Sequence, residues 1–164
     1  MEHKYIYGPV PSRRLGFSLG VDIIPYKNCS FDCIYCQLGK TTNKTIVRKE
    51  YSPTEEILKE INERSKNVKD VDFITFSGSG EPTLHAKLGH LIKELKKITK
   101  LPIAVLTNSS LLFMTKVRKE LSNANIVLPT LCTANQETFQ KIHRPYPEIT
   151  IRKTIDALVE FKKF

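Results

Sequence analysis

Hydrophobic and polar positions follow two different periods along this chain, and these periods predict strands and helices in alternation. Short apolar runs rich in β-branched residues favour strands; they lie at residues 19–24, 71–76, 103–106 and 125–131. Apolar residues that recur every three to four positions favour helices; they lie at residues 52–61, 88–98, 112–121, 139–142 and 151–159. Ser52 is the expected cap of the first helix, with Pro53 in its first turn.

Strands separated by helices predict right-handed crossovers and a parallel sheet, so the expected fold class is α/β. Ligands of such folds sit at the carboxyl ends of the strands. The loops that follow the expected strands hold three cysteines, a glycine-rich turn, Asn108 and Thr130. The sequence therefore predicts one binding site at this rim. Pro129, inside the fourth expected strand, predicts a bend or a missing ladder bond.

Composition favours one domain in a reducing compartment. The chain has 164 residues, of which 40% are hydrophobic, and this is enough for a single core. It contains no apolar run of membrane-spanning length and no signal-peptide pattern in its first ten residues, so we expect a cytoplasmic protein without a membrane partner. Four cysteines are too few for a disulfide scaffold. The net charge of +9 is better explained by a lysine-rich solvated surface than by an anionic partner.

Three of the four cysteines crowd into one C-x3-C-x2-C run, formed by Cys29, Cys33 and Cys36. Three thiolates on one short loop can hold three corners of an iron–sulfur cube and leave the fourth iron open. Zinc is the alternative, because a histidine could supply its fourth ligand after folding. Scattered structural thiols are a further alternative. The spacing favours the cluster. The candidate histidines for zinc are His85, His90 and His143.

Other polar residues give weaker signals. In the stretch SGSGEP at residues 77–82, Gly78 and Gly80 would let the backbone approach a ligand closely, although an ordinary turn with a solvated Glu81 is the alternative. Cys132 is expected to be a small buried residue. Three arginines could hold a carboxylate or phosphate, but surface salt bridges are favoured for each of them. These are Arg13, Arg14 and Arg144.

The motifs together resemble the radical S-adenosylmethionine (SAM) superfamily. The run CSFDCIYC at residues 29–36, with Tyr35 before the last cysteine, matches its cluster signature. The glycine-rich stretch is similar to its Gly-Gly-Glu-Pro loop. Thr107-Asn108 resembles its Thr-Asn-Gly turn, with Ser109 in place of the glycine. The stretches at residues 8–16 and 37–39 resemble a subfamily of short iron–sulfur oxidoreductases related to the wyosine-forming and molybdopterin-precursor enzymes.

This resemblance implies a function and a set of site residues. Cys29, Cys33 and Cys36 would ligate a [4Fe–4S] cluster that receives an electron from an external donor and reductively cleaves SAM. The resulting 5′-deoxyadenosyl radical would abstract hydrogen from an unknown substrate. The residues that would contact SAM are Tyr35, Ser77, Gly78, Ser79, Gly80, Glu81, Asn108 and Thr130.

The resemblance also implies a partial (β/α) barrel. Residues 1–164 are expected to form one radical SAM core domain with about four of the six β/α units, shortened at its C-terminus. The open edge of the sheet could pair in a homodimer. Two other functions stay open: a non-catalytic iron–sulfur-binding fragment, and a tRNA-modifying or tRNA-binding protein suggested by the charge and by the wyosine kinship.

Overall fold

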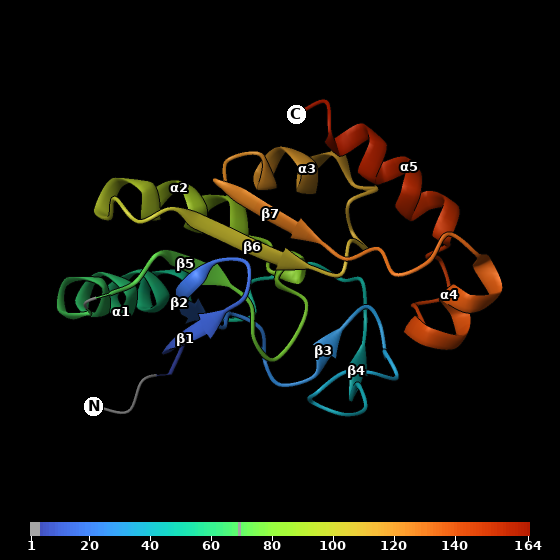
Figure 1. The fold of residues 1–164 in the computed structure, drawn as a ribbon, viewed down its shortest axis with the longest axis horizontal. Helices are drawn as coiled ribbons and strands as arrows, with labels where there is room; N and C mark the ends of the chain where they lie inside the picture. The colour runs from blue at the N-terminus through green and yellow to red at the C-terminus, as the bar shows by residue number, and fades with distance from the viewer. Residues whose placement is uncertain (1–3, 69) are drawn as a thin grey trace.

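The computed structural model describes residues 4–68 and 70–164, and a five-stranded sheet lies at its centre (Figure 1). The strands lie in the order β1-β2-β5-β6-β7. Four of them, β2, β5, β6 and β7, are parallel, and β1 pairs antiparallel with β2. Their bounds are β1 Ile6–Ser12, β2 Gly16–Val21, β5 Phe73–Phe76, β6 Ile103–Thr107 and β7 Ile126–Pro129. This confirms the α/β class with a parallel sheet that does not close into a barrel.

Helices connect the parallel strands and supply the core. Apolar side chains of α1, α2 and α3 pack with those of β2, β5 and β6 in the main hydrophobic cluster. A second, smaller cluster joins α4 and α5 to the cysteine loop. The helices are α1 Thr54–Asn67, the short 3-10 helix η1 Pro82–Leu84, α2 Leu88–Ile98, α3 Thr115–Leu121, α4 Gln136–His143 and α5 Ile151–Phe161.

Two local features differ from the sequence expectation. Strand β1 was not expected, because its sequence IYGPVPS contains two prolines; as an edge strand it tolerates them. Ser52 does not cap α1: its hydroxyl donates to the Ile23 carbonyl. The Glu50 carboxylate instead accepts from the Thr54 amide at 2.9 Å.

None of the helices in the described part of the chain has the length and apolar character that crossing a membrane requires.

The cysteine loop forms its own small layer at the carboxyl ends of the parallel strands. It contains two short paired strands, β3 (Asn28–Cys29) and β4 (Asn43–Lys44). Figure 1 shows these strands between the end of β5 and α4. The sheet and α4 therefore hold the cysteines from two sides.

Removing a core side chain tests this packing. Leu91 of α2 is fully buried in the main cluster, so Leu91→Ala should lower the free energy of unfolding by about 2–5 kcal/mol. Val159 of α5 is largely exposed, and Val159→Ala should change the same quantity by less than about 0.5 kcal/mol. Urea denaturation measures both. An L91A variant as stable as V159A would contradict the core described here.

Candidate metal and cofactor site

The cysteine loop is fixed against α4 by backbone bonds and aromatic packing. The amides of Asp32 and Ile34 donate to carbonyls at the end of α4, each at 2.9 Å. The Phe31 ring is buried against Phe139 and His143, with centroid distances of 5.5 and 5.1 Å. Such a buried aromatic anchor holds the backbone on both sides of Cys33 in place.

The three cysteines line one cavity of about 520 Å³. Each sulfur has a nitrogen neighbour from a different part of the chain. The Lys27 ammonium donates to the Cys36 sulfur at 3.2 Å, and the side-chain amide of Asn108 donates to the Cys29 sulfur at 3.4 Å. A ring nitrogen of His143 lies 3.2 Å from the Cys33 sulfur. Hydrogen bonds to sulfur stabilise thiolate and tune a bound cluster, so this donor set fits an iron–sulfur group.

Burial disfavours the thiolate form of two of the three cysteines. Burial raises the pKa of Cys29 to about 12 and that of Cys33 to about 11. Only a thiolate ligates a metal, so metal binding here must release these protons.

The three candidate histidines of the zinc alternative lie in different surroundings. Among residues 4–68 and 70–164, no group of three or more His, Cys, Asp or Glu side chains, the three cysteines included, is placed to hold one metal ion. His85 is buried and its imidazole bonds Ser52, while His90 sits on the surface of α2. Of the three candidate histidines, only His143 touches a candidate cysteine.

The glycine-rich loop after β5 packs directly on the cysteine loop. A side chain at Gly80 would come within 2.2 Å of the Asn28 carbonyl oxygen, so glycine is needed for this approach. Gly78 has φ +140°, a conformation that other residues rarely adopt. Backbone bonds join the two loops: the Lys27 amide donates to the Ser79 carbonyl, and the Glu81 amide donates to the Asn28 carbonyl.

Glu81 turns inward instead of being solvated. Its carboxylate is buried and accepts from the amide and hydroxyl of Thr83, the hydroxyl of Thr107 and the amide of Asn108, at 2.6 to 3.1 Å. Burial raises the pKa of Glu81, and these donors oppose the shift. All four bonds are internal, so the carboxylate joins the end of β5 to the end of β6.

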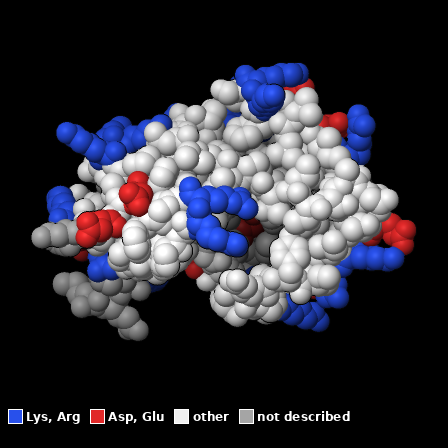
Figure 2. All heavy atoms as spheres, viewed as in Figure 1, with Lys and Arg blue, Asp and Glu red and all other residues white. Residues whose placement is uncertain are grey.

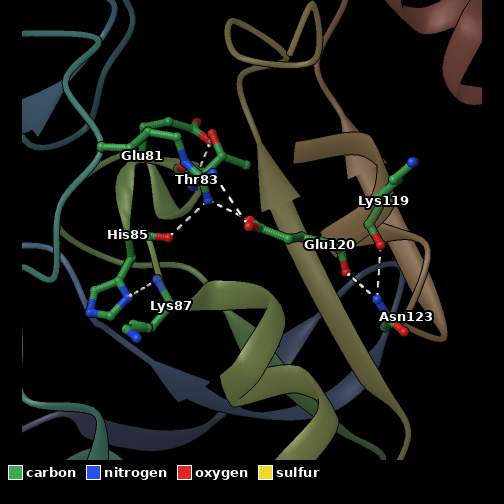
Figure 3. A network of polar contacts seen from close by, with 8 residues as sticks. Glu81, Thr83, His85, Lys87, Lys119, Glu120 and Asn123 are labelled. Carbon is green, nitrogen blue, oxygen red and sulfur yellow. Dashed lines mark hydrogen bonds and ion pairs between the residues drawn. The ribbon is translucent and has the colours of Figure 1, made fainter. Parts of the chain in front are cut away.

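A second network braces the segment that follows Glu81. The Arg48 guanidinium donates to the carbonyls of Thr83 and His85, and it forms an ion pair with Glu120 of α3. Figure 3 shows Glu81 and Thr83 on one side of this network and Glu120 on the other. Both charged partners are mostly buried, so the ion pair fixes η1 relative to α3.

The structure brings together ten of the eleven residues expected at the site. The exception is Ser79, whose amide bonds Asp22 and which lines a different cavity. The ten expected residues that line the cysteine cavity are Cys29, Cys33, Tyr35, Cys36, Ser77, Gly78, Gly80, Glu81, Asn108 and Thr130.

Two features of the site escaped sequence reasoning. Cys132 is exposed, not buried, and its sulfur lies 3.5 Å from the Tyr35 hydroxyl. Lys27 is only 3% exposed, although lysine is rarely buried, and it touches a cysteine sulfur. A lysine two residues before the cysteine run carries no signal of its own in the sequence.

Comparison with known proteins agrees with this geometry. The family model of the Radical SAM superfamily matches residues 23–164. A UPF0026 protein of Methanocaldococcus jannaschii is 40% identical over 95% of this chain and 49% of its own length. A UPF0026 protein of Synechocystis is 40% identical over 96% of this chain and 59% of its own length. The chain spans about half the length of these relatives.

A third relative carries a different name. A Brachyspira hyodysenteriae protein named GTPase Obg is 45% identical over 99% of this chain but only 24% of its own length. A nucleotide-binding P-loop needs the pattern GxxxxGK[ST]. This chain has Gly39-Lys40-Thr41, but position 34, where the first glycine belongs, is isoleucine. The sequence of this chain therefore does not contain that motif.

Replacing Glu81 tests its role as an internal tie. Glu81→Ala leaves two amides and two hydroxyls without their acceptor and should lower the free energy of unfolding by at least about 2 kcal/mol. Glu81→Gln keeps one acceptor oxygen and should fall between E81A and the wild type. Glu137 pairs with Lys141 on the surface, so Glu137→Ala should cost less than about 1 kcal/mol. Chemical denaturation compares the three, and an E81A variant as stable as E137A would refute the tie.

Proposed function

The chain belongs to the radical SAM superfamily, and we propose that it binds a [4Fe–4S] cluster on Cys29, Cys33 and Cys36 and cleaves SAM reductively. The observation that carries this proposal is the cavity in which the three cysteines meet the glycine-rich loop. When bound, the cluster supplies an electron and one iron without a protein ligand.

The neighbouring residues would position SAM beside the cysteines. Gly78 and Gly80 line the cavity, so the backbone of their loop would supply the groups that meet the methionine ammonium, while the space beside the two glycines is filled by Asp22 and Asn28. Asn108 and Thr130 present polar groups at the ends of β6 and β7. Glu81 supports this set from behind, because its carboxylate bonds the Asn108 amide. We therefore assign Glu81 a positioning role.

Tyr35 has two candidate roles in this proposal. Its ring lies edge-on to His143, with centroids 5.7 Å apart, and its hydroxyl lies 3.2 Å from a ring nitrogen of that histidine. The side chain is half exposed at the mouth of the cavity. From there it can shield the cysteines from water or face the adenine of SAM.

SAM cleavage is the direct test. Protein reconstituted anaerobically with iron and sulfide should form 5′-deoxyadenosine when SAM and dithionite are added. Cys33→Ala should abolish the product, because it removes one of three cysteine ligands. Cys132→Ser is the matched cysteine control, since Cys132 lies outside the motif and serine supplies a hydroxyl that can bond Tyr35, and it should keep the product. Chromatography of the nucleoside products measures all three proteins.

The alternatives give different results in the same assay. A wild-type protein that holds a cluster but forms no 5′-deoxyadenosine would be a non-catalytic iron–sulfur protein. A wild-type protein that binds no cluster would contradict the proposal entirely. A tRNA-binding function would show as a salt-sensitive shift of tRNA in a gel.

The buried Lys27 makes a further prediction about the cluster. Its ammonium lies against the Cys36 sulfur, and a nearby positive charge favours the more negative, reduced cluster. Lys27→Gln should therefore move the midpoint potential to a more negative value. Lys40 is exposed on the same loop, so Lys40→Gln should leave the potential nearly unchanged. Redox titration followed by electron paramagnetic resonance measures both, and equal potentials would contradict the role of Lys27.

A further inference from the structure

The turn between β1 and β2 presents two adjacent arginines from a fixed backbone. Arg13, Arg14 and Leu15 form this turn, and Leu15 is buried with 3% exposure. Gly16 follows with φ +63°, which lets the chain reverse direction. The Phe17 amide then donates to the Asp72 carboxylate at 2.7 Å. The turn is thus anchored on its third residue and at its exit, while the two arginines stay exposed.

Both arginines line the same cavity as the three cysteines. Within the described residues, neither guanidinium makes an ion pair or hydrogen bond. The salt bridges expected for them are therefore absent, whereas Arg144 does pair with Asp32 at 3.7 Å. Figure 2 shows basic side chains beside the hollow on this face. Two unpaired guanidinium groups on a cavity wall form a site for an anion.

The arginines and the cysteine loop reach this cavity from the two ends of β2. They precede β2, while the cysteine loop follows it. With six residues at roughly 3.3 Å each, β2 itself is about 20 Å long. The match to the superfamily begins at residue 23, after this turn. The arginines therefore line the cavity from a part of the chain that lies outside the superfamily match.

We propose that Arg13 and Arg14 bind a carboxylate or phosphate group of the substrate and orient it toward the cysteine end of the cavity. This inference rests on the proposed function, because it assigns the remaining part of the same cavity. Arginine suits the role since its planar fork can bond two oxygens of one anion. The substrate class is thus an anionic molecule long enough to reach from the turn toward SAM.

Anion binding to the reconstituted wild-type protein tests the proposal. The probes are inorganic phosphate and acetate, titrated by calorimetry at low ionic strength, with and without saturating SAM. We expect saturable binding of at least one probe, unchanged by SAM. The preferred probe shows whether the site suits phosphate or carboxylate. Arg13→Gln/Arg14→Gln should weaken this binding by about tenfold or more.

Two further variants make the test specific. Arg13→Lys/Arg14→Lys keeps the positive charges but removes the planar guanidinium groups, so it should bind the anion with intermediate affinity. Lys96→Gln/Lys97→Gln removes two charges from the last turn of α2 and should stay within about twofold of the wild type.

Three results would overturn the inference. They are the absence of saturable binding by the wild type, equal weakening in R13Q/R14Q and K96Q/K97Q, and displacement of the probe by SAM. The last would mean that the arginines hold the SAM carboxylate. Formation of 5′-deoxyadenosine by the same wild-type sample reports separately on the proposed function. A sample that forms this product but binds neither anion refutes only the arginine site, and one that binds an anion without forming the product refutes the radical chemistry.

Discussion

The buried carboxylate of Glu81 is the interaction on which the candidate site depends. A carboxyl group without solvent is tolerated only when its hydrogen-bonding capacity is used, and here four donors meet it from η1 and from the end of β6. The Asn108 amide is one of these donors. The side chain of Asn108 in turn donates to the Cys29 sulfur and the Ser30 hydroxyl. One carboxylate thus sets the distance between the strand ends and the cysteine loop.

The cysteine loop is too short to fold on its own, and its geometry is imposed from both sides. On the sheet side, Gly80 permits contact with the loop backbone because no side chain intervenes. On the other side, Phe31 packs into the small cluster formed with α4 and α5. A loop held at both faces loses little entropy when a ligand binds, which favours a preorganised site. This packing explains why α4 and α5, which follow the last strand of the sheet, contribute to a site on the loop after β2.

The sequence could predict the parallel sheet and most of the site because both leave local signals. Apolar periodicity located the parallel strands, and cysteine spacing located the loop. The inward turn of Glu81 left no such signal, since its donors Thr107 and Asn108 lie 26 and 27 positions away. Strand β1 was missed because prolines disfavour strands except at an edge, and edge position is a property of the assembled sheet. The orientation of Glu81 and the formation of β1 both depend on contacts with distant parts of the chain, which local propensity does not record.

The superfamily match covers only some of the residues that line the cavity. Its cysteine and glycine loops fall inside the superfamily match, whereas the β1–β2 turn falls before it. The relative from Brachyspira aligns over 99% of this chain, so the turn belongs to the region shared with that protein even though it lies outside the superfamily match. A segment that lies outside the superfamily match, yet is fixed by Leu15 and Asp72 and lines the cysteine cavity, suits the substrate-binding role proposed for its arginines. Radical formation and substrate choice would then reside in separate parts of one sheet, joined by β2.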